Sequence, residues 1–212
     1  MANEIVKHHS ELNTITLRSF TAVEMNLFFS IVSRMRAKNN QVVRFTFPQL
    51  KELSNYKATA NKNFLNDLRS TYTKLIRLNF GRTSKSGLRF EAFVMFTDFD
   101  INGDTEEPYV DIKLHEKALP LLNELDSWVR YSLQQFNQLQ SSYSKTMFRL
   151  LKQFRTTGYV YFTKEDLHEL LDIPKSYNQG TIDQRVFSPI RKELTPLFRG
   201  LTIKKKYGKG RG

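Results

Sequence analysis

A group of basic, hydroxyl and amide side chains follows Pro174. Arg can donate two hydrogen bonds to the edge of guanine, and Asn or Gln can pair with adenine in the same bidentate way. A solvated helix face has a similar composition, so the position of this stretch in the fold must decide between the two interpretations. The candidate side chains are Lys175, Ser176, Tyr177, Asn178, Gln179, Thr181, Gln184, Arg185, Arg191 and Lys192.

Three further basic clusters could contact phosphate groups. The final 14 residues contain no acid, and their Gly208 and Gly210 are typical of a turn. A solubilising tail is the alternative there, and capping or solvation of a charged helix face is the alternative for the other two clusters. In chain order the side chains are Lys57, Thr59, Asn61 and Lys62, then a helical stripe of Lys145, Arg149, Lys152 and Arg155, then Lys204, Lys206, Lys209 and Arg211.

The charge balance favours a polyanionic partner. The 212 residues include 33 Lys or Arg against 21 Asp or Glu, a formal charge of +12. Nucleic acid is the polyanion that best fits this excess, although a ribosomal surface or an anionic membrane would satisfy the same balance. The absence of cysteine excludes disulfides and thiolate zinc sites. The chain has no secretory signal and no run long enough to span a membrane, which predicts a cytoplasmic protein.

The residues of common catalytic sites lack the required spacing. His8 and His9 are adjacent, and His115 and His168 stand alone, so the His-hydrophobic-His metal pair of nicking enzymes is missing. The stretch GRTSKSG at residues 81–87 lacks the Gly-Lys-Ser/Thr sequence of a phosphate-binding loop. We therefore expect no enzymatic activity, no cofactor and no metal.

The elements that position the candidate residues occur twice. FPQLKELSNYK at residues 47–57 shares its pattern with KEDLHELLDIPK at residues 164–175. Apolar periodicity and capping-box spacing predict helices over 21–38, 48–54 and 59–77, a strand over 41–47 between the first two, and strands over 75–80, 88–99 and 109–114 after them. The second half predicts helices over 141–157, 163–173 and 181–194 and strands over 159–162 and 201–206.

This repeated order is typical of a winged helix-turn-helix, in which the third helix enters a major groove and a hairpin lies against the backbone. The predicted fold is α+β, with two tandem winged-helix domains at residues 1–122 and 123–212. In this arrangement the helix over 181–194 is a third helix in a basic unit, which favours DNA contact over solvation. A second wing strand is missing after residue 206, so the wing is either truncated or completed differently.

Three stretches, IVKHHSELNTITLRSFTAVEMNLFFSIVSRM, LQSSYSKTMFRLLKQFRTTGY and ELLDIPKSYNQGTIDQRVFSPIRKEL, resemble the replication-initiator (Rep) family of iteron-containing, theta-replicating plasmids. The similarity is closest to initiators of Gram-positive cocci and extends over nearly the whole chain. It implies binding of repeated double-stranded DNA sites at a plasmid origin, with the second domain as the main reader. It also implies dimerisation and auxiliary DNA contact through the first domain, repression of the initiator's own gene by the dimer, and host partners such as the helicase or its loader.

Two other functions remain open from the sequence. A winged-helix transcriptional repressor without an initiator role would bind one inverted repeat as a dimer, whereas an initiator binds several direct repeats as separate monomers. A nicking replication enzyme would relax supercoiled origin DNA in the presence of a divalent metal.

Overall fold

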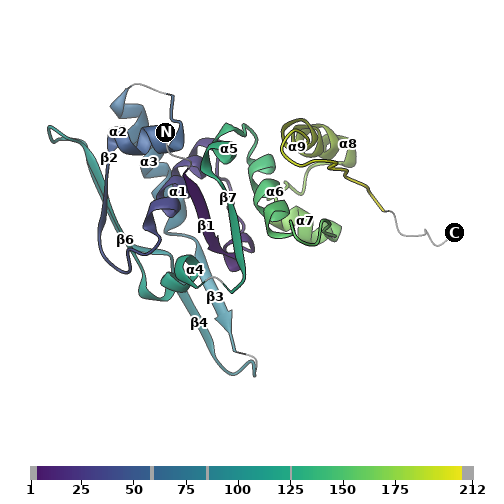
Figure 1. The fold of residues 1–212 in the computed structure, drawn as a ribbon, viewed down its shortest axis with the longest axis horizontal. Coiled ribbons are helices and arrows are strands. Elements are labelled where there is room, and N and C mark those ends of the chain that lie inside the picture. The colour runs from purple at the N-terminus through teal and green to yellow at the C-terminus, as the bar shows by residue number, and fades with distance from the viewer. Residues whose placement is uncertain (1–3, 58–59, 85, 125, 207–212) are drawn as a thin grey trace.

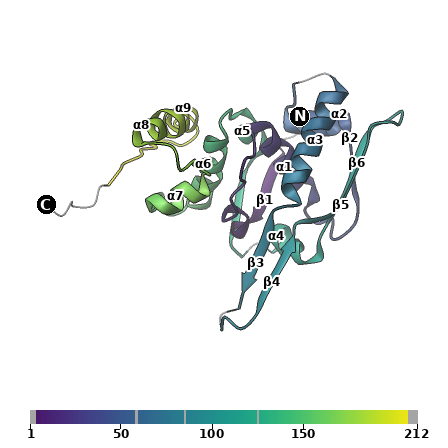
Figure 2. The ribbon, with the colours of Figure 1, turned by 180° about the vertical axis from the view of Figure 1, so that it is seen from behind.

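The protein is elongated and has two lobes (Figure 1). The computed structural model describes residues 4–57, 60–84, 86–124 and 126–206. The larger lobe holds the N-terminal helices and all the strands of the described residues, and the smaller lobe holds the green and yellow helices near the C-terminus. Seen from behind, the segment after the last helix leaves the small lobe on the side away from the large one (Figure 2).

The first lobe is built around a helix that is apolar on most of its surface. In α1 (Ala22–Met35), Leu27, Phe28 and Ile31 are all buried, and Thr21 and Glu24 form the predicted reciprocal capping box. This helix packs against the next two helices. The elements that follow α1 are β2 (Val43–Thr46), α2 (Phe47–Ser54) and α3 (Asn61–Leu75).

The strands of this lobe are antiparallel. A three-stranded sheet has the order β2-β6-β5, and a separate hairpin of β3 and β4 projects from the body in Figure 1. The central strand of the sheet alternates, and its buried Val110, Ile112 and Leu114 face the core, as expected for a sheet with one covered face. The strand bounds are β3 (Asn79–Thr83), β4 (Phe90–Val94), β5 (Phe96–Asn102) and β6 (Tyr109–Leu114).

A second two-stranded sheet joins distant parts of the sequence. Strand β1 (Ile5–His9) pairs with β7 (Trp128–Ser132), with Val6 opposite Tyr131. The pairing crosses the division predicted after residue 122, and the position of the domain boundary stays a prediction. Short helical elements complete the lobe: η1 (Ser10–Asn13), η2 (Glu116–Ala118), α4 (Leu119–Asn123) and α5 (Leu133–Gln138).

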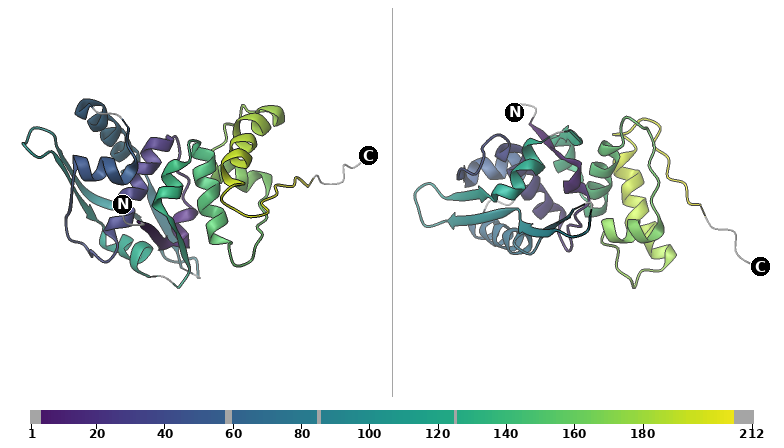
Figure 3. Two further views of the ribbon diagram at one scale, coloured as in Figure 1. Left: turned by 45° about the horizontal axis from the view of Figure 1, so that its top comes forward. Right: turned by 90° about the horizontal axis from the view of Figure 1, so that it is seen from below.

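All the regular secondary structure among the described residues of the second lobe is helical. Helix α6 (Ser142–Gln153) lies between the two lobes, against β7 on one side and α9 on the other (Figure 3). The predicted inward residues Val186, Ile190 and Leu194 are fully buried. The remaining elements are α7 (Lys164–Leu170), α8 (Gln179–Ile182), the π-helical turn η3 (Asp183–Phe187) and α9 (Ser188–Leu194).

The predictions of strands over 159–162 and 201–206 are wrong for the described residues, because neither segment is in a strand. A strand needs a neighbour that pairs with its backbone N–H and C=O groups. Alternation of residue types in YVYF and LTIKKK therefore did not suffice to form a ladder.

Candidate nucleic-acid interface

Two helix-turn-helix corners have the same backbone geometry. Asn55 follows α2 and Asp172 follows α7, and both adopt the left-handed conformation, with φ of 53° and 52°. The N–H of Asn55 donates to the carbonyl of Glu52, and the N–H of Asp172 donates to that of Glu169. Asn and Asp tolerate this conformation better than most residues. The repeat seen in the sequence is thus a repeated corner that leads into a third helix in each lobe.

The third helix of the second lobe begins with a side-chain cap. Asn178 is the N-cap of α8, and its Oδ1 accepts from the N–H of Thr181 at 2.9 Å and from the Thr181 hydroxyl at 3.0 Å. The predicted base contact by Asn178 therefore competes with a cap that the helix uses. Its Nδ2 group remains available as a donor at the helix N-terminus, where winged-helix readers enter a groove.

One wide turn divides this helix. In η3 the N–H of Ser188 donates to the carbonyl of Asp183, a π-type bond across five residues. Pro189, in the first turn of α9, has no N–H, and its ring would clash with the carbonyl of Arg185 in a regular α-helix. The π-type turn relieves that conflict, so α8, η3 and α9 continue as one helical element, called the reading element below for its predicted role.

The predicted contact residues of the second lobe lie on this element or just before it. Tyr177 and Thr181 are half-buried, and the others are exposed: Lys175, Ser176, Asn178, Gln179, Gln184, Arg185, Arg191 and Lys192. Arg185 Nη1 donates to the Tyr177 hydroxyl at 3.4 Å, and its guanidinium lies 5.6 Å from the centre of that ring. The tyrosine orients Arg185 beside the helix N-terminus.

The basic segment after α9 is attached to the reading element. Lys205 forms an ion pair with Asp183, and this ammonium lowers the pKa of the Asp183 carboxyl. Lys204 and Lys206 on either side are exposed. Attachment through Lys205 directs these two ammonium groups to the solvent next to η3. The predicted contacts Lys209 and Arg211 lie outside the described residues.

The start of α3, which is the corresponding region of the first lobe, has fewer features suited to base contact. Lys57, Asn61 and Lys62 are exposed at the start of α3, and Thr59 lies outside the described residues. Asn61 Oδ1 accepts from Lys51 Nζ at 2.8 Å, and the N-cap residue Ala60 supplies no side-chain cap. Asp67 accepts a hydrogen bond from the Tyr56 hydroxyl, which together with burial raises the pKa of that tyrosine.

The predicted basic stripe on α6 is wrong for two of its four members. Lys145 and Arg149 are fully buried at the junction of the lobes, whereas Lys152 is half-buried and Arg155 is exposed. Burial lowers the pKa of Lys145 to about 7. Sequence reasoning assigned one apolar face to the helix, but buried Phe148 lies one turn from Lys145 and marks a second covered face.

Near Arg149 the interior holds polar atoms without partners. The Arg149 guanidinium makes no hydrogen bond to the described chain and lies 4.7 Å from the centre of the Phe29 ring. His8 is buried, and its Nδ1 is 2.8 Å from the carbonyl oxygen of His9. Burial lowers the pKa of His8 to about 3, so this imidazole is neutral and adds no second positive charge beside Arg149.

Other ligand classes have little support from the described residues. They contain no cluster of His, Cys, Asp or Glu suited to a metal ion. None of their helices is long and apolar enough to cross a bilayer.

Comparison with protein-family models covers both lobes. The model "Initiator Replication protein, WH1" matches residues 5–152, and "Initiator Rep protein, WH2" matches residues 163–212. The chain belongs to the Rep family of replication initiator proteins. The two family models meet between residues 152 and 163, later than the division predicted after residue 122. Family membership confirms the predicted initiator role and the pair of winged-helix domains, and it opposes the nicking-enzyme alternative.

Individual relatives agree with this assignment. The Rep-family chain is 32% identical over 215 residues to the "Probable replication protein rep" of Bifidobacterium longum (strain NCC 2705), with 100% of the chain and 71% of that relative covered. Its fold matches the "Crystal structure of Pi initiator protein in complex with iteron DNA" with a TM-score of 0.71 at 15% identity, over 99% of this chain and 94% of the other. The narrower similarity to initiators of Gram-positive cocci stays a prediction.

Proposed function

We propose that this Rep protein binds repeated double-stranded DNA sites at a plasmid origin in the cytoplasm, with α8–α9 as the main reading element. The observation that carries the proposal is the exposed face of that element, where Arg185 and Gln184 lie beside the capped helix N-terminus and Lys204 and Lys206 flank it. Arg and Gln can read guanine and adenine, and the lysines can neutralise phosphates.

The first lobe supplies auxiliary DNA contact and the surface for dimerisation in this proposal. Its Lys57, Asn61 and Lys62 are exposed at the start of α3, but Lys51 already occupies the Asn61 oxygen. Backbone contact at the edge of a repeat fits these groups better than base reading. A dimer that represses the initiator's own gene and recruitment of the host helicase or its loader complete the proposed role.

Selection of duplexes from a random library at near-physiological salt tests sequence reading, because salt suppresses binding that depends on charge alone. The expected result is one long motif that spans two adjacent major-groove faces. Strong binding without an enriched motif would contradict the proposal. Footprinting on the origin then separates the functions: several direct repeats bound by monomers support an initiator, and one inverted repeat bound by a dimer supports a pure repressor.

A further inference from the structure

A network of hydrogen bonds lies at the junction between the lobes. Its centre is the ammonium group of Lys145 on α6, which donates to Asn26 Oδ1 at 2.6 Å and to the carbonyl of Phe136 at 2.6 Å. Lys145 is fully buried and also lies 4.4 Å from the centre of the Phe136 ring. Within the described residues no carboxylate forms a hydrogen bond with this group, so its bonds connect helices rather than neutralise charge.

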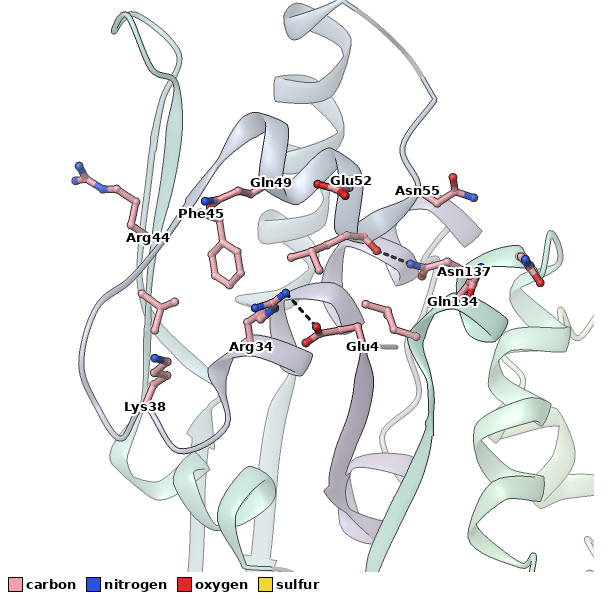
Figure 4. Close-up of a pocket in the computed structure, with 14 residues that line it drawn as sticks. Glu4, Arg34, Lys38, Arg44, Phe45, Gln49, Glu52, Asn55, Gln134 and Asn137 are labelled. Atoms are coloured by element: carbon pink, nitrogen blue, oxygen red, sulfur yellow. Dashed lines mark hydrogen bonds and ion pairs between the residues drawn. The ribbon is translucent and has the colours of Figure 1, made fainter. Parts of the chain in front are cut away.

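Toward the first lobe the network ends at the helix-turn-helix corner. Asn26 Nδ2 donates to the carbonyl of Ser54 at 3.2 Å, and Asn137 Nδ2 donates to the carbonyl of Leu53 at 2.7 Å. Figure 4 shows Asn137 at the margin of a groove of about 560 Å³, next to the end of α2. These carbonyls come directly before the turn into α3, so the network holds the corner that positions the first reading helix.

Toward the second lobe the network reaches α9. Glu193 accepts from the N–H of Gln140 at 3.0 Å and from the N–H of Ser141 at 3.4 Å. Ser141 is the N-cap of α6, and α6 packs along α9. The start of the helix that carries Lys145 is therefore tied to the end of the second reading element.

A reciprocal contact holds the other corner. The segment before α1 reaches across to the end of α7, where Thr16 Oγ1 donates to the carbonyl of Glu169 at 3.1 Å and the N–H of Ser19 donates to Asp172 at 2.9 Å. The second corner is thus held by residues that precede α1, and the first corner is held by Asn26 of α1 and Asn137 of α5. Hydrogen bonds set register in a way that apolar packing does not, because a slide of one helix leaves buried polar groups unpaired.

We propose that Lys145 is a positioning residue that sets the spacing and rotation between α3 and α8–α9, and so the length of the DNA repeat that the protein accepts. This inference rests on the proposed function. One inserted base pair moves a half-site by about 3.4 Å and about a tenth of a turn. A rigid junction cannot follow that movement, whereas a junction without the ammonium can adjust.

The test compares the affinity for the selected repeat with the affinity for two altered repeats. These carry one base pair more, or one fewer, between the segment of DNA that the first lobe contacts and the segment that the second lobe contacts. The wild-type protein is expected to lose about tenfold or more in affinity on either change, comparable with a mismatched base pair. Lys145→Met keeps the aliphatic stem. Its loss of affinity on the same change in repeat length should be smaller than that of the wild type by a factor of at least about three. Lys117→Met, an exposed lysine of η2, serves as the matched control and should behave as wild type.

Glu193→Ala provides a second variant that leaves the buried lysine in place and loosens the junction at α9. This variant should also reduce the difference in affinity between repeats of different length. Thermal unfolding checks that both variants are folded. Equal discrimination by wild type and both folded variants would overturn the inference and leave DNA reading intact. Failure of the wild-type protein to select any motif would instead refute the proposed function.

Discussion

The first helices of the two lobes each bury charge, but they compensate it differently. In α1, Glu24 is buried and accepts hydrogen bonds from the N–H of Thr21, from Ser70 and from Lys74, and the lysine and these donors lower its pKa against the opposing effect of burial. In α6, Lys145 and Arg149 are buried without a carboxylate bonded to them among the described residues. The first arrangement ties α1 to α3 within one lobe. The second lies at the junction and is maintained at an electrostatic cost.

The third helices of the two lobes also differ, in how they start and in how regular they are. Helix α3 runs without interruption for 15 residues and starts without a side-chain cap. The second reading element is capped by Asn178, widened at η3 and flanked by exposed lysines. The two third helices thus hold the same place in the chain order but differ in capping, regularity and exposed charge. Five predictions test this comparison, from the largest expected effect to the smallest.

Removal of the compensated charge should destabilise the protein most. Glu24→Ala leaves Lys74 partly buried and removes the capping-box acceptor, so the free energy of unfolding should fall by about 3 kcal/mol. Lys145→Met removes a buried ammonium group to which no carboxylate of the described residues is hydrogen-bonded, and it should change the free energy of unfolding by less than about 1 kcal/mol or increase it. Urea denaturation at pH 7 measures both values. Equal losses in the two variants would remove the contrast between α1 and α6.

The pH dependence of stability should reveal the buried amine. The pKa of Lys145 is about 7 in the folded protein and 10.5 ordinarily, so the unfolded chain binds more protons between these values. Stability should therefore rise with pH across this window by up to about 1.4 kcal/mol per pH unit, and the cost of the cation is fully present below pH 7. Lys145→Met should lack this rise between pH 7.5 and 9.5, and Lys117→Met should retain it.

Substitutions on the two third helices should affect DNA binding differently. Arg185→Ala is expected to weaken binding to the selected duplex by about 10- to 100-fold and to relax the preference at one base position. Lys62→Ala on α3 should weaken binding to all DNA sequences by a similar small factor. Fluorescence anisotropy with matched and single-mismatch duplexes measures both. A uniform loss in Arg185→Ala would reassign that residue to phosphate contact.

Exchange of the caps should shift stability in opposite directions. Asn178→Ala removes the acceptor for Thr181 and should cost about 1 kcal/mol. Ala60→Ser adds a hydroxyl at an N-cap that already has extended backbone angles, φ −72° and ψ 124°, and should stabilise by about 0.5–1 kcal/mol. Thermal unfolding of the two single variants and the wild type gives the comparison. No gain in Ala60→Ser would show that the α3 N-terminus is satisfied in another way.

The smallest expected effect concerns the lysines after α9, and it should appear in the salt dependence of DNA affinity. Each of Lys204→Ala and Lys206→Ala should reduce the slope of log affinity against log salt by about 1, without a change in sequence preference. Lys205→Ala releases the segment from Asp183, and its slope should fall further than that of either neighbour. An unchanged slope in Lys204→Ala and Lys206→Ala would identify the segment as a solvated tail.

Local sequence patterns predicted the repeated corners and most helices. Thr21 with Glu24 fixes the start of α1 through contacts three residues apart, and the periodic Val186, Ile190 and Leu194 define the inner face of the second reading element. The candidate DNA contacts were found by subtraction of that inner face, and most of those described are exposed. Such features depend on neighbours along the chain and can be read from one sequence.

Only the tertiary structure decided what the junction buries. Whether Lys145 and Arg149 meet solvent depends on β7 and α1, which lie far from them in sequence, and on the pairing of β1 with β7. The missing strands at 159–162 and 201–206 have the same cause, since a ladder requires a distant partner whatever the local alternation. The sequence by itself determined the two winged-helix units and their basic character, and long-range packing decided how the two units are held together.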